Sequence, residues 1–343
     1  MTAGINLALL GYSVVIYDKG PEVGHRHHGD FQALENYSSH EEILDSLSRM
    51  NLPGDFLKVP FKTLDILDKK LNLSVIESKR AGLYLIKRGT GADTLDQAFK
   101  RRAVEVGVGF QLDHPIDPAK ADIVATGPRR AMMAAAGINF RSHGPERIAL
   151  LLSHRVTPGG YSYLALADGW GTVGAVLFDR RVGARRALEG AVQAFQKVYD
   201  LNISDPRPFS GRGDFFLAPS YSDGKRLFVG EAAGLQDYWL GFGIRYALIS
   251  GHLAARALAE GREFNRLLKE SGIIAQARAS LSNRFIFELM GKVSHRWLIN
   301  RWAGADDIIE FMRESVNPSL LKSLLYPLAK WALKGRLGDG LPP

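Results

Sequence analysis

Residues 229–258 read VGEAAGLQDYWLGFGIRYALISGHLAARAL, and the order of residue types in this stretch decides the fold. The apolar run that ends at Val229 predicts a buried strand, and Glu231 follows it among small residues that let the backbone approach a ligand closely. We expect a helix over about 243–259. Its start is formed by Gly241, Gly243 and Ile244. The amide groups and the positive dipole end at such a start can face an anion or a polarised carbonyl.

Two further segments have the same α/β character. Residues 2–10 have apolar positions compatible with a helix, and the apolar run 13–17 predicts a strand. The sequence ADIVATG over 121–127 predicts a second buried strand, after a helix over about 94–106 with Thr94 as its N-cap. Helices and buried strands that alternate in this way are typical of nucleotide-binding α/β domains.

The middle of the chain has a different pattern. Within 158–178, two strand-like runs are joined through Asp168-Gly169, which predicts a hairpin in an antiparallel sheet. The polar stretch 20–39 predicts a loop, of which residues 29–36 would line a pocket. Further strand character covers 75–86, and helical patterns cover about 40–50, 63–71 and 184–199. Beyond Gly261 only helical patterns follow. The simplest organisation is an α/β fold with one discontinuous nucleotide-binding domain, an inserted antiparallel-sheet domain and a helical C-terminal tail.

Residues 229–258 resemble the second flavin-binding motif of the flavoprotein superfamily that includes para-hydroxybenzoate hydroxylase and the geranylgeranyl reductases. That motif has a Gly-Asp-Ala-Ala-Gly segment and a helix that begins Gly-x-Gly-Ile, and Gly230 and Glu231 stand at its first two positions here. The resemblance implies a Rossmann-like FAD-binding domain, in which the Glu231 carboxylate accepts a hydrogen bond from a ribityl hydroxyl. The alternative is a strand, turn and helix packed by small residues for their own sake.

The resemblance covers most of residues 2–260 and implies three regions. The FAD-binding domain is expected from 1–39, 88–145 and 222–261. The substrate domain is expected from 40–87 and 146–221, and the helical C-terminal region from 262–343. In this arrangement the substrate sheet lies beside the flavin domain, and the tail matches the family only in being helical.

The resemblance also bears on the start of the chain. In this superfamily a Gly-x-Gly-x-x-Gly turn follows the first strand, and the second strand ends in an acid that binds the adenosine ribose. Asp18, with Lys19 beside it, resembles that acid, and residues 2–8 resemble the helix that follows the turn. On this alignment the first strand and the glycine loop are missing, so we expect the true start upstream of Met1. A truncated protein, a degenerate protein and an ordinary helix–strand step with a solvated Asp18 are the alternatives.

Four more positions are expected near the cofactor. The resemblance implies that Arg26 is a charge-assisted donor to the pyrophosphate and that Arg88 approaches the flavin where the chain re-enters its domain. Thr126 and Gly127 correspond to a turn that passes close to the cofactor. A solvated basic loop and a surface arginine are the alternatives for Arg26 and Arg88. The histidine-rich loop 24–30 lacks the spacing of a metal site, and we predict none.

Aromatic residues predict the substrate pocket. Tyr161 and Tyr163 alternate on one face of the expected hairpin, and together with Trp239 they would line an apolar cavity over the flavin. Half-buried positions in the sheet core are the alternative for the two tyrosines. No residue stands out as a proton donor, so none is predicted to be catalytic.

The C-terminal region is basic and contains an amphipathic pattern. The net charge is +8, and residues 262–343 hold 13 Lys and Arg against 8 Asp and Glu, which gives +5. In SLLKSLLYPLAKWALKGR (319–336), large apolar residues fall within about 140° of a helical wheel and lysines lie opposite. This profile is typical of a helix on an anionic membrane surface, and also of one packed on its own core. No basic heptad or zinc-finger spacing occurs, so no nucleic acid partner is expected.

These features predict an FAD-dependent oxidoreductase similar to the geranylgeranyl reductases, which would reduce alkene bonds of an isoprenoid or other lipid-like substrate. Electrons would come from NAD(P)H or a ferredoxin-like donor. Flavin-dependent aromatic hydroxylation is one alternative, although Thr126-Gly127 stands where the hydroxylases usually have Asp-Gly. A non-catalytic relative that binds a membrane or a partner is the other. The chain has no cysteine and no secretory or spanning pattern, so we expect a cytoplasmic protein, with peripheral membrane contact through its C-terminal helices.

Overall fold

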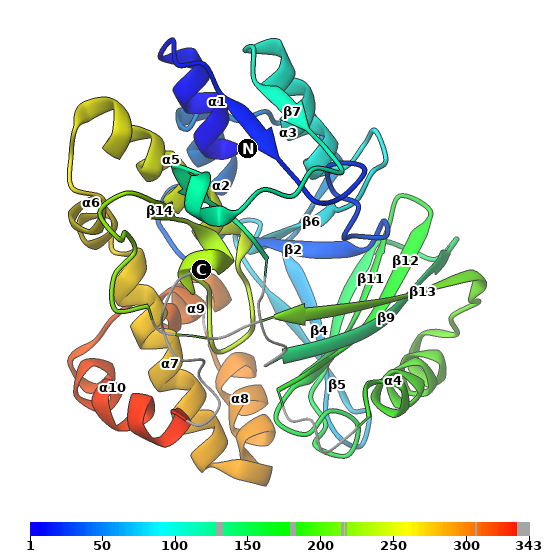
Figure 1. Ribbon diagram of the computed structural model, residues 1–343. Coiled ribbons are helices and arrows are strands. Elements are labelled where there is room, and N and C mark those ends of the chain that lie inside the picture. The colour runs from blue at the N-terminus through cyan, green and yellow to red at the C-terminus, as the bar shows by residue number, and fades with distance from the viewer. Residues whose placement is uncertain (128–132, 179–182, 214–215, 217, 306, 335–343) are drawn as a thin grey trace.

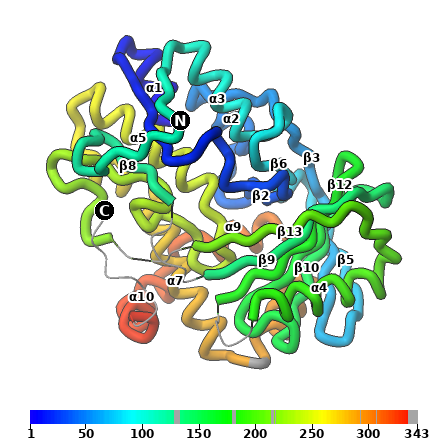
Figure 2. Tube along the Cα trace, turned by 45° about the vertical axis from the view of Figure 1, so that its right-hand side comes forward, coloured from blue at the N-terminus to red at the C-terminus, as the bar shows by residue number. Residues whose placement is uncertain are grey.

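The computed structural model describes residues 1–127, 133–178, 183–213, 216, 218–305 and 307–334. Figure 1 shows an upper part that holds the start of the chain and short parallel strands, a large twisted sheet on the right, and helices at the lower left. Figure 2 shows the same parts after a 45° turn, with the C-terminal helix α10 (Leu320–Leu333) at the outside of the helical layer.

The upper part is built on two pairs of parallel strands. Strand β1 (Val15–Tyr17) pairs with β7 (Gly109–Gln111), and β14 (Leu227–Phe228) pairs with β8 (Ile123–Val124). The helices of this part are α1 (Thr2–Leu9), α2 (Ile43–Arg49), α3 (Leu95–Glu105) and α5 (Ile244–Glu260). Thr94 caps α3 by accepting a hydrogen bond from the Gln97 amide, as its sequence predicts.

Helices α1 and α5 pack closely because small residues line their contact. A Cβ atom on Gly251 would lie 3.1 Å from the Cβ of Thr2 and 3.5 Å from the amide nitrogen of Ala3. A larger side chain at 251 would therefore push the two helices apart. The small residues of the 229–258 stretch thus hold the chain start against the helix that follows the glycine-rich turn.

The large sheet has seven strands in the order β13-β9-β12-β11-β10-β4-β5. Their bounds are β4 (Thr63–Leu67), β5 (Leu73–Glu77), β9 (Met133–Arg141), β10 (Arg147–Leu151), β11 (Tyr161–Ala167), β12 (Trp170–Leu177) and β13 (Ser204–Gly213). The β11–β12 hairpin turns at Asp168 and Gly169, both with positive φ, as the sequence predicts. Strands β10 and β4 run parallel and the other neighbours antiparallel, so the sheet is mixed. Helix α4 (Ala184–Tyr199) covers one face with buried Ala191 and Phe195.

A three-stranded antiparallel sheet lies beside the large one. Its order is β2 (Phe31–Glu35), β6 (Leu83–Lys87) and β3 (Lys58–Phe61). The Phe31 amide donates a hydrogen bond of 3.1 Å to the Thr172 hydroxyl, which donates to the Asn139 side-chain oxygen at 2.8 Å. All three residues are buried, so this chain of hydrogen bonds holds the small sheet against β12 and β9.

Two local expectations from the sequence are wrong. The segment 63–71, expected as a helix, forms β4 and the turn into β5. The Asp68 carboxylate accepts hydrogen bonds from the amides of Lys70 and Asn72, which reverses the chain although the apolar residues also fit a helical spacing. Strand β2 lies in what the polar composition of 20–39 indicated to be a loop, because cross-strand pairing with β6 stabilises it.

The C-terminal region is helical, as expected. Its helices are α6 (Phe264–Glu270), α7 (Ile273–Leu289), α8 (Ser294–Ala303), α9 (Ile308–Val316) and α10. In the part of the chain that the structure describes, none of the helices has both the length and the apolar character needed to span a membrane. The α/β fold class with an added helical tail is confirmed. The domain boundaries stay a prediction; β9, from the segment 88–145, is a strand of the large sheet.

Candidate functional site

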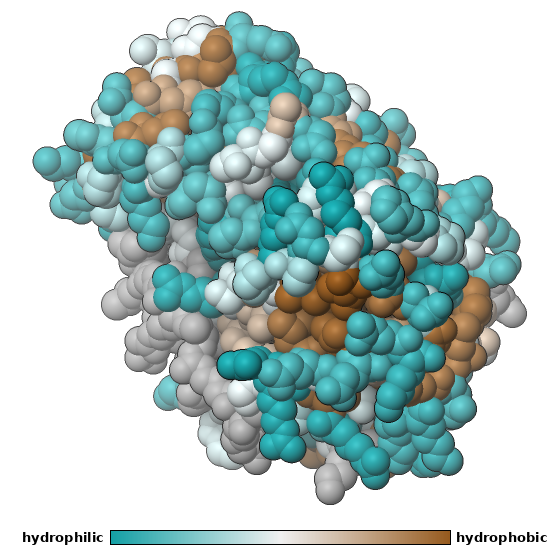
Figure 3. Space-filling view, turned by 90° about the vertical axis from the view of Figure 1, so that its right-hand side faces the viewer, coloured by the Kyte–Doolittle hydropathy of each residue, from teal (hydrophilic) through white to brown (hydrophobic). Residues whose placement is uncertain are grey.

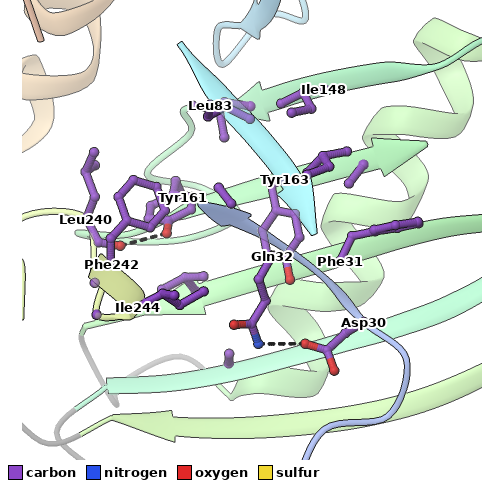
Figure 4. Close-up of a pocket in the computed structure, with 18 of the residues that line it drawn as sticks. Asp30, Phe31, Gln32, Leu83, Ile148, Tyr161, Tyr163, Leu240, Phe242 and Ile244 are labelled. Carbon is purple, nitrogen blue, oxygen red and sulfur yellow. Dashed lines mark hydrogen bonds between the residues drawn. The ribbon is translucent and has the colours of Figure 1, made fainter. Parts of the chain in front are cut away.

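A cavity of about 460 Å³ lies between the three-stranded sheet and the seven-stranded sheet. The small sheet contributes Phe31, Gln32, Leu83 and Leu85, and the large sheet contributes Ile148, Tyr161, Tyr163 and Val176. Figure 4 shows Phe31, Gln32 and Leu83 of the small sheet and Ile148, Tyr161 and Tyr163 of the large sheet around this space, from strands that are distant in the sequence. Seen from the side of the large sheet, hydrophobic side chains gather in a hollow that hydrophilic ones border (Figure 3). The cavity walls are mainly apolar, as a site for an apolar ligand requires.

The residues that line the cavity include two chemically different groups. The first, named the charged group below, contains Arg26, Arg212 and Glu231, with Gly241, Gly243 and Ile244 at the start of α5. The second, named the apolar group, contains Trp302, Ile308, Ile309 and Met312 of the helical tail. A ligand with both polar and apolar parts would match this lining.

The glycine-rich turn has the backbone shape that its composition indicates. Gly230 has φ of 56° and Gly241 has φ of 86°, in the left-handed region that favours glycine. The Gly230 amide donates a hydrogen bond of 2.9 Å to the Ser250 hydroxyl of α5. A Cβ on Gly230 would lie 3.1 Å from the Cβ of Ala247, so this glycine also permits close packing of the turn on α5.

Helix α5 begins at the cavity. Its N-cap residue Gly243 forms no side-chain cap, and both Gly243 and Ile244 line the cavity. The first amide groups of a helix have no partner within the helix. The structure therefore places the start of α5 where its amides and dipole can act on a bound group.

Arg26 contacts two segments whose sequences predict cofactor contacts, at Glu231 and Gly127, and a third segment at Arg212. Its guanidinium donates to the Glu231 carboxylate at 3.4 Å and to the Arg212 carbonyl at 3.0 Å. A Cβ atom on Gly127 would lie 2.4 Å from Nη1 of Arg26, so the guanidinium rests on the backbone that follows β8. The Arg26 side chain is 45% exposed and that of Glu231 is 24% exposed, so both remain accessible to a ligand.

Arg88 has a different environment. It forms two hydrogen bonds of 2.8 Å to the two oxygens of Asp96, and the Gly89 amide donates to the same carboxylate. Burial alone would raise the pKa of Asp96, but the hydrogen bonds and charge of Arg88 outweigh burial and hold that pKa below its usual range. Arg88 lines the cavity while Asp96 fixes its orientation.

The remaining predicted cofactor residues lie outside the cavity lining. The Asp18 carboxylate accepts a hydrogen bond of 2.8 Å from the Gly20 amide and closes the turn after β1, and Lys19 beside it is exposed. Thr126 is exposed at the end of β8. Neither Asp18, Lys19, Thr126, Gly127 nor Gly230 is among the residues that line the cavity. Their contact with a cofactor stays a prediction.

The two predicted pocket tyrosines line the cavity. The Tyr161 hydroxyl donates a hydrogen bond of 2.7 Å to the Leu240 carbonyl (Figure 4). Tyr163 lies across Gly174, since a Cβ on that glycine would come 2.3 to 2.7 Å from atoms of the phenol ring. Burial raises the pKa of both hydroxyls, so both stay protonated. Trp239 does not line the cavity and is buried in a core cluster with Ile66 and Phe287.

A polar network that the sequence did not predict lies at the start of β2, within the stretch 29–36 that was expected near the pocket. Asp30 accepts hydrogen bonds from the His28 amide at 2.9 Å and from the Gln32 side chain at 2.8 Å. Arg88 donates to the Gln32 side-chain oxygen at 3.3 Å. Burial, followed by the charge of Arg88, lowers the pKa of His27 to about 4, so its ring is neutral at pH 7. The alternation of polar and apolar residues over 30–35 was the available signal.

Two buried acids lie behind the cavity wall. Burial raises the pKa of Glu35 to about 7, and the Ser38 hydroxyl donates to its carboxylate. Burial raises the pKa of Asp237 to about 6, even though that carboxylate accepts hydrogen bonds from the amides of Trp239 and Leu240. The sequence alone does not indicate that either carboxyl is buried, because the burial of both results from contacts between segments distant in the chain.

The chain was compared with known proteins. No protein-family profile matches it, and no curated protein does. A geranylgeranyl bacteriochlorophyll reductase-like protein from Thermoplasma acidophilum superposes with a TM-score of 0.57 at 16% identity, with 98% of this chain and 96% of that chain covered. A flavoprotein/dehydrogenase from Cytophaga hutchinsonii superposes with a TM-score of 0.61 at 13% identity, with 97% and 96% covered. The chain shares the flavoprotein fold.

A third match supports this statement. The myxobacterial chondrochloren halogenase, described as a variant of FAD-dependent halogenases, has a TM-score of 0.58 at 15% identity, with 99% of this chain and 88% of that chain covered. The shared fold is the one that the resemblance of residues 229–258 implies. The three proteins differ in the reactions their names describe, so the shared fold alone does not select a reaction.

Proposed function

We propose that the chain is an FAD-dependent oxidoreductase that reduces an alkene bond of an isoprenoid or other lipid-like substrate. The observation that carries the proposal is the cavity, whose lining combines a charged, glycine-rich group with many apolar side chains within a flavoprotein fold. Its volume of about 460 Å³ is within the usual range of small-molecule sites. Binding of an apolar ligand is favourable because the apolar walls replace water around it.

The residues of the charged group fit FAD. Arg26 offers a charged donor for a phosphate, Glu231 offers an acceptor for a hydroxyl, and the uncapped start of α5 offers amide donors. Gly241 and Gly243 leave the backbone accessible at the cavity wall. Asp18, Lys19, Arg88, Thr126 and Gly127 are proposed as further contacts. When bound, FAD supplies hydride or electron transfer, which the protein side chains cannot perform.

The chain's own residues would orient the substrate and exclude water. Tyr163 is held flat across Gly174, and its hydroxyl forms no hydrogen bond with any residue in the described part of the chain. Because its raised pKa keeps it protonated, this hydroxyl can donate a hydrogen bond to a bound substrate. Trp302 and Met312 line the cavity with apolar side chains, against which an isoprenoid chain would pack.

The proposed reaction adds two hydrogens to one carbon–carbon double bond. Two electrons and one hydrogen arrive as hydride, and a proton completes the second carbon–hydrogen bond. The electrons would be supplied by NAD(P)H or a ferredoxin-like donor, and the product is the saturated lipid. No cysteine takes part, because the chain has none.

An anaerobic half-reaction tests the proposal. Chain loaded with FAD and reduced with dithionite is mixed with geranylgeraniol, and the absorption of the oxidised flavin is followed with time. The proposal predicts that this absorption returns and that mass spectrometry finds a product with two added hydrogens. Absence of reoxidation without oxygen, together with substrate-dependent oxygen uptake and a hydroxylated aromatic product, would contradict alkene reduction and support the hydroxylase alternative.

A further inference from the structure

Helix α10 has two apolar arcs on opposite sides. At 3.6 residues per turn, Tyr326, Ala329 and Leu333 share one side of the helix, and they pack in the core cluster that includes α7. The other side carries large side chains that remain exposed. These are Leu320 (78% exposed), Leu321 (63%), Leu324 (69%), Leu328 (48%) and Trp331 (74%), named the α10 apolar face below.

The α10 apolar face is not needed to hold the helix in place. Packing on α7 through Ala329 and Leu333 already supplies that contact, and both residues are buried. In Figures 1 and 2 the helix lies at the periphery of the helical layer. Single exposed apolar residues are normal on a protein surface, whereas five on successive turns of one helix indicate an interaction site.

The charges around this face identify the occupant. Residues 315–338 contain no Asp or Glu, while they contain four Lys and Arg. Lys330 and Lys334 are exposed on the flank of the helix between its two apolar arcs. Lys322 is held by the carbonyls at the end of α9 and fixes the α9–α10 corner instead. An apolar strip on a helix whose own charged side chains are all positive is complementary to an anionic lipid surface.

We propose that α10 lies in the plane of an anionic membrane surface, with the α10 apolar face inserted among the acyl chains and Lys330 and Lys334 at the headgroups. The α7 side of the helix then faces the protein, so α10 separates the protein core from the lipid. Helix α9 contributes Ile308, Ile309 and Met312 to the lining of the cavity. Three residues, 317–319, join it to α10. The proposal does not depend on flavin or on any redox activity.

Vesicle sedimentation tests the proposal. The full chain is mixed with vesicles of pure phosphatidylcholine or of phosphatidylcholine with phosphatidylglycerol, and the bound fraction is measured. The proposal predicts binding to the anionic vesicles that weakens with salt. The double variant Leu324→Glu with Trp331→Glu should reduce this binding by roughly tenfold or more, because two inserted side chains are lost. The matched control is Leu73→Glu with Val75→Glu, which changes the charge equally at exposed positions of β5 and should leave binding unchanged.

Two further measurements separate the proposal from other occupants. Replacing Lys330 and Lys334 by Gln should weaken binding to anionic vesicles and leave the thermal unfolding curve unchanged. Light scattering after gel filtration reports on the oligomeric state of each variant. The proposal is overturned if the chain binds neither kind of vesicle, or if the test and control double variants lose binding equally. It is also overturned if the unsubstituted chain is a dimer that binds no vesicle and Leu324→Glu with Trp331→Glu dissociates that dimer. In that last case a second copy of the chain covers α10.

Discussion

The guanidinium of Arg26 lies 3.4 Å from the carboxylate of Glu231, across 205 residues of chain. One partner comes from the loop after β1 and the other from the turn between β14 and α5. The same guanidinium donates to the Arg212 carbonyl, so three segments meet at one side chain. All three residues belong to the charged group that lines the cavity, so a substitution of Arg26 tests whether this group binds FAD.

Arg26→Ala should weaken FAD binding. A hydrogen bond to a charged group contributes about 1.5–3 kcal/mol, which corresponds to roughly tenfold or more in the dissociation constant. Quenching of FAD fluorescence during titration measures this constant. Arg185→Ala is the matched control, because that side chain is 93% exposed on α4 and does not line the cavity, and it should not change the constant. Equal affinities of Arg26→Ala and the control would remove Arg26 from the cofactor site.

Gly174→Ala should destabilise the fold. The added methyl group would overlap the Tyr163 ring, which must move, and overpacking of this kind costs about 1–3 kcal/mol in the free energy of unfolding. Urea denaturation measures that energy. At Gly211, on β13, a Cβ atom would meet only Ala135 at an ordinary 3.6 Å, so Gly211→Ala serves as the control. A Gly174→Ala variant as stable as Gly211→Ala would contradict the position of Tyr163.

The ion pair of Arg88 and Asp96 should be structural as well as functional. Arg88→Met leaves the Asp96 carboxylate buried without its charged partner, which costs about 3–5 kcal/mol in the free energy of unfolding. Adding Asp96→Asn should recover part of that loss, because a neutral amide costs less to bury than a lone carboxylate. Chemical denaturation of the single and double variants provides the comparison. A double variant less stable than Arg88→Met would argue against an uncompensated charge.

Glu35 should make stability fall as pH rises. Its pKa is 4.5 in its ordinary state and about 7 when folded, so between these values the unfolded chain releases a proton that the folded chain keeps. The free energy of unfolding therefore decreases by roughly 1.4 kcal/mol for each unit of pKa difference, with most of the loss complete above pH 7. The lowered pKa values of His27 and His295 act in the opposite direction, so this contribution is measured as the difference between the unsubstituted chain and Glu35→Gln in urea denaturation from pH 4 to pH 8.

Glu35→Gln should remove the Glu35 contribution to this pH dependence. A second contribution of the same sign and similar size should remain from Asp237, whose pKa of about 6 when folded is also above its usual range. Glu105→Gln, at an exposed position on α3, should keep the decline of the unsubstituted chain. An unchanged decline in Glu35→Gln would show that this carboxyl is not the titrating group.

Local patterns in the sequence predicted much of the fold. The hairpin turn at Asp168-Gly169, the N-cap Thr94 and the glycine-rich turn with α5 each depend on residues close together in the chain, and each occurs as expected. The 63–71 segment failed because its apolar spacing suits both helix and strand, and the turn at Asp68 decided between them. Local chemistry is a sufficient guide only where one conformation satisfies it.

The cavity depended on contacts that no local pattern contains. The Phe31 amide and the Thr172 hydroxyl are 141 residues apart, yet their hydrogen bond sets one sheet against the other. Tyr161 and Tyr163 could be selected because they alternate on one predicted strand. Ile309 and Met312 could not, since their role follows from the packing of the helical tail against the small sheet, where Ile309 lies 3.7 Å from a Cβ placed on Gly82.

The most direct test of the central claim is retention of FAD by the purified chain. The protein is incubated with excess FAD, separated from free cofactor by gel filtration, and examined by visible absorption and circular dichroism. The account predicts a flavin absorption that elutes with the protein in a near one-to-one ratio and an induced dichroism signal in the flavin bands. A folded protein that elutes without any flavin absorption would contradict the proposal that this cavity serves an FAD-dependent reaction.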